Sequence, residues 1–188
     1  FGKFHLEMIW WHEAQFALWN RSNLLDRTLG WYEKVEPIAR QIAQRQGFDG
    51  VRWMKMTDPS GTEAPSKVGS FLIWQQPHLI YLAELLYRAD PTKEVLEKYN
   101  RLVQETAEFM YSFATYDELE GRYVLKGAIP AQETLRAAET INPPFELSYW
   151  HFAMQTAQQW RERMGQHAVQ AAKAAGYRNA GTIEYVLD

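Results

Sequence analysis

The residues best suited to chemistry in this sequence are four carboxylates beside aromatic or proline-containing segments. Glu63 lies in GTEAPS and Glu133 in IPAQE, and both segments are irregular. Glu7 and Glu146 lie where helices are expected to begin, close to Trp and Tyr residues. Paired carboxyl groups can cleave a glycosidic bond, since one protonates the leaving oxygen while an ionised partner acts across the sugar. Any one of the four, taken alone, is better explained as a solvated carboxylate or as one that complements a helix N-terminus.

Aromatic side chains are concentrated around these carboxylates. They make up 14% of the 188 residues and include eight tryptophans, among them Trp10, Trp11, Trp53, Trp74 and Trp150. Aromatic residues in that quantity serve first in a hydrophobic core. Their other use is to stack on sugars or bases, and a net charge of −3 without a basic stripe argues against nucleic acid. The aromatic residues therefore strengthen the carbohydrate interpretation of the carboxylates as a group.

The opening stretch FHLEMIWWHEAQFALWN places polar residues in an unusually apolar segment. Residues 6–19 are apolar almost all round, which predicts an inner helix with neighbours on most sides. Burying one of its polar side chains without a partner would cost about 1–3 kcal/mol. Two explanations stay open for Glu7, His12, Glu13 and Gln15. Either they pair with one another inside a core, or they line a cavity that binds a polar molecule.

Other catalytic and metal-binding patterns are missing from the sequence. The string HEAQF begins like the zinc-protease pattern HExxH, but Phe16 occupies the position of the second histidine. His5 and His12 are seven residues apart, and two histidines without a third ligand are weak support for a metal. The chain has no cysteine, no GxSxG segment and no phosphate-binding GxxxxGK(S/T) loop. We therefore expect neither a metal nor a cofactor.

Helical periodicity dominates the chain and predicts an all-α fold of paired helices. The second helix is expected to be interrupted near Gly30 and Pro37 and to end at Gly47. Thr92 is expected to cap a long helix, and a minor β-hairpin is expected near residues 119–126. The predicted helices cover residues 6–19, 22–46, 78–89, 92–115 and 146–164.

Two long connections join these helices. Residues 48–71 and 126–145 lack clear periodicity, and both segments carry carboxylates. Loops of that length in a compact domain are usually functional or disordered, and the first is too aromatic for disorder. The sequence therefore predicts a site built by loops on a helical scaffold.

Composition also bears on partners and location. No apolar run approaches the ~20 residues that a membrane-spanning helix needs, so we expect no membrane partner. A chain without cysteine suits the cytoplasm, and a periplasmic location is compatible as well.

Five segments, in this order along the chain, carry a family resemblance. They are HLEMIWWHEAQFALWN, RWMKMTDPSGTEAPS, FLIWQQPHLIYLAELLYR, IPAQE and NPPFELSYW. Together they resemble bacterial six-hairpin glycosidases, which are (α/α)6-toroid enzymes akin to family 65 and family 95 glycoside hydrolases. The resemblance covers about residues 1–163 and implies paired helices that act on glycosidic bonds. A complete ring needs six hairpins and this chain predicts about half, so we expect a partial toroid whose exposed flanks favour self-association.

The resemblance also implies roles for individual residues. In that group the general acid is a Glu in a loop between inner helices, and IPAQE matches it here, so Glu133 is the candidate acid. Members mostly invert, using a base that activates water or phosphate, and Glu63 and Glu146 are the candidates for that base. The residues expected to bind a small carbohydrate are Glu7, Trp10, Trp11, His12, Trp53, Trp74, Gln75, Gln76 and Trp150.

The C-terminal segment resembles a different family. Residues 164–188 are similar to a helix-turn-strand of the biotin carboxylase ATP-grasp site, in which the Glu of the GTxE(F/Y) strand, here Glu184, binds Mg-ATP. Residues 1–163 and 164–188 are therefore expected to be separate units, the second with a short strand. An alternative to carbohydrate chemistry is an inactive helical scaffold in a chimeric or generated sequence. A third hypothesis is a nucleotide-binding fragment that depends on Glu184.

Overall fold

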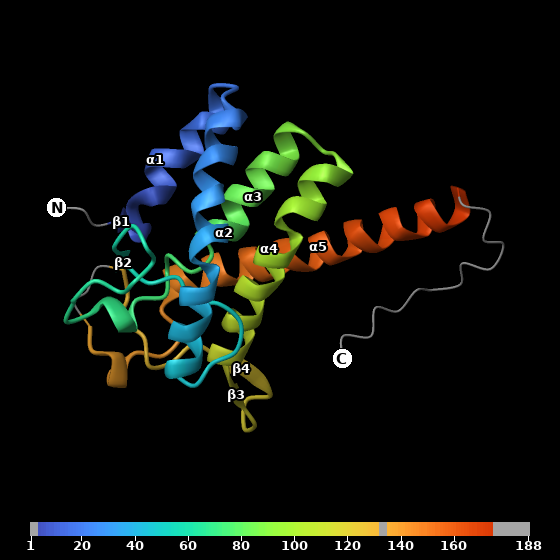
Figure 1. The fold of residues 1–188 in the computed structure, drawn as a ribbon. Coiled ribbons are helices and arrows are strands. Elements are labelled where there is room, and N and C mark those ends of the chain that lie inside the picture. Colours follow the sequence, from blue (N-terminus) through green and yellow to red (C-terminus); the bar gives the residue numbers. More distant parts are fainter. Residues whose placement is uncertain (1–3, 132–134, 175–188) are drawn as a thin grey trace.

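The computed structural model describes residues 4–131 and 135–174, and these residues form a mostly helical fold (Figure 1). The all-α prediction is confirmed, with two small antiparallel β-pairs in addition. The helices are α1 Leu6–Leu18, α2 Ser22–Arg45, α3 His78–Ala89, α4 Lys93–Phe113 and α5 Pro144–Ala174. The paired strands are β1 Phe4–His5 with β2 Met56–Thr57, and β3 Thr115–Asp117 with β4 Arg122–Val124.

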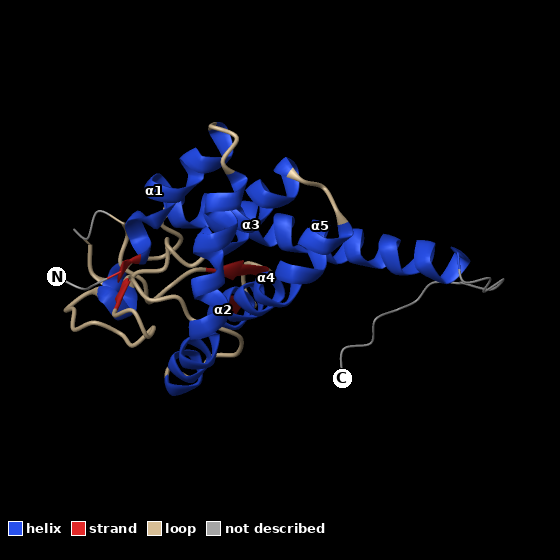
Figure 2. Ribbon diagram, turned by 45° about the horizontal axis from the view of Figure 1, so that its top comes forward, coloured by secondary structure: helices blue, strands red, loops and turns tan. Residues whose placement is uncertain are grey.

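The helices are arranged as two antiparallel hairpins and one long single helix. Short connections at residues 19–21 and 90–92 join α1 to α2 and α3 to α4. Helix α3 lies at the centre, in contact with the other four helices, and α5 packs across α3 and α4 (Figure 1). The C-terminal half of α5 extends beyond the rest of the fold (Figures 1 and 2). The expected β-hairpin is confirmed between α4 and the second long loop.

Local sequence signals end and begin several helices as expected. The side chain of Thr92 accepts a hydrogen bond from the backbone N–H of Val95, which caps α4. Helix α2 ends at Arg45, and Gly47 follows with a positive φ of 81°. A left-handed residue at this position closes a helix, and glycine adopts it without strain.

The predicted interruption of the second helix is wrong, because α2 is continuous through Gly30 and Pro37. A proline inside a helix costs about 3 kcal/mol, since it removes one backbone hydrogen bond and crowds the preceding turn. Burying one large apolar side chain stabilises the folded state by about 1.5–3 kcal/mol. The buried stripe of α2 continues on both sides of Pro37, which is itself exposed. Its members include Leu25, Leu29, Tyr32, Val35, Ala39 and Ile42.

The predicted inner position of the first helix is also wrong. Leu6 is the only residue of α1 that is fully buried. Helix α1 lies at the edge of the fold against α2 and α3, and Leu18 and Trp19 at its end are 84% and 73% exposed. His12 and Gln15 are exposed as well, so water hydrates them and no internal pairing is needed. An apolar sequence identified the helix but did not show how many neighbours cover it.

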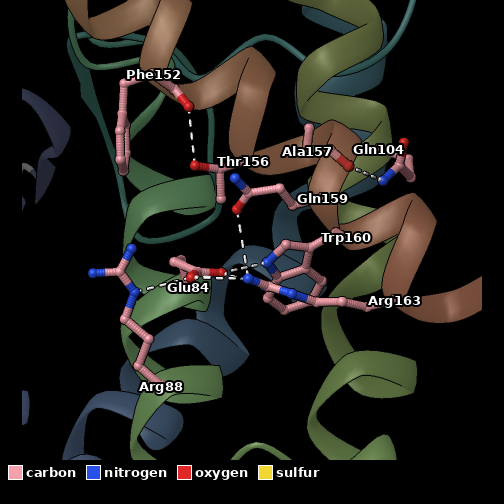
Figure 3. A network of polar contacts seen from close by, with 9 residues as sticks. All are labelled: Glu84, Arg88, Gln104, Phe152, Thr156, Ala157, Gln159, Trp160 and Arg163. Carbon is pink, nitrogen blue, oxygen red and sulfur yellow. Dashed lines mark hydrogen bonds and ion pairs between the residues drawn. The ribbon is translucent and has the colours of Figure 1, made fainter. Parts of the chain in front are cut away.

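The main core lies among α2, α3, α4 and α5, and a buried ion-pair network ties α3 to α5 (Figure 3). Glu84, which is 3% exposed, accepts hydrogen bonds from Trp160 at 2.8 Å and from Arg163 at 2.7 Å. Arg88 on α3 completes the network at 2.9 Å. Helix α5 is continuous across residues 163–164, where the boundary between two units was predicted. Glu184 and the expected C-terminal strand lie outside the described residues.

Candidate functional site

The first turns of α1, α3 and α5 meet at one end of the fold, and His78 joins them. His78 is the first residue of α3. Its Nε2 lies 3.3 Å from the backbone oxygen of Glu7 on α1, and its Nδ1 lies 3.0 Å from the hydroxyl of Tyr149 on α5. A carbonyl oxygen only accepts, so Nε2 carries the proton and Nδ1 accepts from the tyrosine. Burial lowers the pKa of His78 to about 4, which keeps the imidazole neutral near pH 7.

Glu7 is held at this end by a lysine from the first long loop. Its Oε1 lies 3.5 Å from Nζ of Lys55, and both side chains are largely buried. His5 approaches the same oxygen at 3.9 Å. The short β1–β2 pairing, in which His5 is opposite Met56, brings these residues together. A carboxylate beside a cation can accept hydrogen bonds from hydroxyl groups.

An aromatic surface lies next to Glu7. We call Trp11, Trp74 and Phe145 the aromatic face. The ring centroids of Trp11 and Phe145 lie 5.6 and 5.9 Å from that of Trp74. Trp11 and Phe145 are 52% and 55% exposed, whereas Trp74 between them is 6% exposed. The indole nitrogen of Trp74 is buried and has no hydrogen-bond partner in the described part of the chain. The exposed rings of Trp11 and Phe145 can stack on the apolar faces of a bound molecule.

Four of the predicted sugar-binding residues instead hold the loop backbone from inside. The side-chain oxygen of Gln76 accepts from the backbone N–H of Trp53 at 2.8 Å, and Gln75 donates to the Trp53 carbonyl at 3.0 Å. The Trp53 indole donates to Thr106 at 2.9 Å. The indole of Trp150 donates to a backbone oxygen in the 71–77 segment at 3.0 Å. All four are at most 4% exposed, so they present no surface to a solute.

Glu146 fixes the start of the segment that contains the candidate acid. It is fully buried at the first turn of α5, and its Oε1 accepts the backbone N–H of Ala131 at 2.7 Å. The N–H of Ile129 donates to the carbonyl of Phe71 at 2.9 Å, which ties the same segment to the first long loop. Burial raises the pKa of Glu146. Glu133, two residues beyond Ala131, lies outside the described residues.

Of the remaining predicted residues, Glu63 and His12 lie away from the aromatic face, and Trp10 lies against α3. Glu63 pairs with Arg45 at 2.7 Å in a separate hollow of about 510 Å³ at the end of α2. His12 faces a groove between α1 and α2 rather than the aromatic face. Trp10 contacts Tyr81 of α3 with centroids 5.6 Å apart. The structure thus brings Glu7, Trp10, Trp11 and Trp74 together at one end, and leaves Glu63 and His12 elsewhere.

Sequence reasoning missed the residues that connect the three helices. His78, Tyr149, Lys55 and Phe145 were not predicted to take part in the site. One signal was available for His78, since a histidine directly after a helix-starting proline faces an apolar run in HLIYLAELL. The others depend on contacts between segments far apart in the chain, which single-segment patterns do not contain.

Comparison with known proteins assigns the chain to no family. It matches no family model and no curated protein. Among the residues that the structure describes, no group of His, Asp or Glu side chains is arranged to hold a metal ion. No described helix combines the length and apolarity that crossing a bilayer requires. Any functional assignment therefore depends on the geometry at the meeting point of the three helices.

Proposed function

We propose that this chain is part of an (α/α)6 toroid and that its loop-bearing end binds a carbohydrate and acts on a glycosidic bond. The observation that carries the proposal is the meeting of the first turns of α1, α3 and α5, where the carboxylate of Glu7 pairs with Lys55 beside the aromatic face. Helices α2 and α4 run back between them, so the odd-numbered helices begin at the same end (Figure 1). That alternation is what inner and outer helices of a toroid require.

Individual residues take distinct roles in this proposal. Trp11 and Phe145 stack on the C–H faces of a sugar, and Glu7 accepts hydrogen bonds from its hydroxyl groups. Glu133 donates the proton to the leaving oxygen, while water or phosphate forms the new bond to the sugar carbon that this oxygen leaves. Glu146 is too buried to touch a sugar, so we assign it the positioning of the Ala131 segment that leads to Glu133.

A second candidate is an inactive helical scaffold, favoured by the burial of Trp53, Trp150, Gln75 and Gln76. Each of these four makes a structural hydrogen bond, which is what a scaffold would require of them. The two candidates differ in the response to ligand, because only a site that binds the folded state raises its stability.

A thermal melt with a panel of mono- and disaccharides at millimolar concentration separates the candidates. The proposal predicts a cooperative transition that moves up with at least one sugar. The shift should be lost in Glu7→Ala and kept in Glu33→Ala, an exposed carboxylate on α2. A cooperative melt that no sugar moves would support the scaffold and contradict the carbohydrate proposal.

A further inference from the structure

A groove between α1 and α2 has the size and lining of a small-molecule site. Its volume is about 530 Å³, within the ~300–1,000 Å³ that ligand pockets usually have. It lies on the side of α1 that faces α2, away from the contacts of Trp10 with Tyr81 of α3 and of Trp11 with Trp74. It therefore does not share its wall with the aromatic face.

The two ends of the groove differ in polarity. Helices α1 and α2 are antiparallel around the turn at residues 19–21, so residues near 13 lie opposite residues near 28. Glu13, Arg27 and Thr28 consequently form a polar end near the turn. The other end is apolar, with Ile9 beside Trp31, whose ring lies 5.2 Å from that of Phe4.

The charges at the polar end have no partners in the described part of the chain. Glu13 is half-buried, and its Oε2 is shielded from solvent and accepts no hydrogen bond. Arg27 is exposed and makes no hydrogen bond or ion pair with a described residue. The indole of Trp31, by contrast, already donates to the backbone oxygen of Pro59 at 2.9 Å. A partly buried carboxylate without a partner is unfavourable, and a bound cationic group would relieve that cost.

We propose that the groove binds a small zwitterion with an apolar side chain, an aromatic amino acid or a molecule of that class. Its ammonium group pairs with Glu13, its carboxylate pairs with Arg27, and its apolar part packs between Ile9 and Trp31. The opposite charges of Glu13 and Arg27 select a zwitterion over a simple cation or anion. His5 and His12 also line the groove.

This site is independent of the carbohydrate proposal, because it uses none of the residues assigned to sugar binding there. A thermal melt with sugars and a titration of this groove can therefore succeed or fail separately.

Three related probes test the proposal in the intact chain by NMR of its Met and Ile methyl groups. L-phenylalanine carries both charges, phenethylamine lacks the carboxylate, and 3-phenylpropanoate lacks the ammonium group. L-phenylalanine should shift the methyl signals of Met8 and Ile9, which line the groove. It should also bind about tenfold or more tightly than either single-charge probe, as expected from one charge-assisted hydrogen bond.

Two variants and two matched controls assign the charges. Glu13→Gln should reduce the affinity for L-phenylalanine about tenfold, and so should Arg27→Gln. Arg27 is exposed and makes no hydrogen bond or ion pair with a described residue, so this variant stays informative even if Glu13→Gln unfolds. Glu33→Gln and Arg161→Gln, at exposed positions on α2 and α5, should bind as the parent does. Absent methyl shifts, equal affinities for the three probes, or variants that match the controls would each overturn the proposal.

Discussion

At the scale of single residues, His78 and Glu146 show how burial changes the role of an ionisable group. His78 uses both ring nitrogens to join α1 to α5, and it does so only as a neutral imidazole. Glu146 uses one oxygen to hold the backbone of Ala131. Both groups therefore hold other segments of the chain in place, and changing either one should change the free energy of unfolding.

The free energy of unfolding should fall as the pH is lowered from about 6.5 towards 4, because of His78. Its pKa is about 4 in the folded chain and about 6.5 when unfolded, so the unfolded state binds the proton first and acid favours unfolding. The loss attributable to this group reaches about 3 kcal/mol. Urea unfolding across this pH range measures it.

The control for this prediction is a second histidine. His78→Asn should flatten the slope above about pH 5, whereas His151→Asn, at an exposed position on α5, should leave it unchanged. Carboxylates with lowered pKa values, such as Glu36 and Glu84, lose their contribution below about pH 4.5 in every variant. Equal slopes in the parent and His78→Asn would contradict the neutral, buried imidazole.

Glu146 should tolerate glutamine but not alanine. Glutamine keeps an oxygen for the N–H of Ala131 and removes a charge whose burial raises the pKa of the carboxyl group. Glu146→Gln should therefore be at least as stable as the parent at pH 7. Glu146→Ala leaves the amide without an acceptor and should cost about 1–3 kcal/mol. Urea unfolding and amide hydrogen exchange at Ala131 measure both, and equal stability of the two variants would refute this role.

At the scale of elements, the first long loop is held by contacts that local sequence cannot specify. Gln75 and Gln76 bind its backbone, and Gly50 allows it to lie directly on α4. A Cβ on Gly50 would lie 2.3 Å from the carbonyl oxygen of Glu105 and 2.5 Å from the backbone nitrogen of Phe109. The φ of Gly50 is 68°, which side-chain-bearing residues rarely adopt.

Gly50→Ala should therefore destabilise the chain more than a left-handed glycine usually does. Gly47→Ala is the matched control, because its φ is also positive, 81°, but nothing lies within 4 Å of the added Cβ. The control should cost about 1–2 kcal/mol, the usual strain of a left-handed side chain. Gly50→Ala should cost clearly more, since α4 backbone must move as well. Urea unfolding compares the two, and equal losses would show that the loop does not press on α4.

Sequence patterns predicted the elements better than their surroundings. Periodicity, Thr92 and Gly47 located helix ends because those signals act within a few residues. The same reasoning failed for α1 and for the interruption at Pro37, since burial depends on segments distant in the chain. It also placed Trp53 and Trp150 at a surface site, because an indole suits a core and a sugar pocket equally well. His78 was overlooked because its role comes from contacts with Glu7 and Tyr149, which lie far from it in the chain.

At the scale of the whole molecule, the long loops and the first turns of α1, α3 and α5 gather at one end (Figure 2). The segments that carried the glycosidase resemblance meet there, through contacts such as Glu7 with Lys55 and Trp11 with Trp74. The continuous α5, fixed by Arg163 on Glu84, shows no break where two families were expected to join. Exposed Leu18 and Trp19 are compatible with self-association, which stays a prediction.

The most direct test of carbohydrate binding at the aromatic face is NMR of the eight tryptophan indole N–H groups during a sugar titration. The indole signals of Trp11 and Trp74 should move with a sugar that raises the melting temperature, since the ring of Trp11 is exposed and that of Trp74 lies 5.6 Å from it. Those of Trp53, Trp150 and Trp160 should stay in place, because these indoles are buried and already hydrogen-bonded. Shifts confined to the buried indoles, or none with any sugar, would contradict a carbohydrate site at this end of the fold.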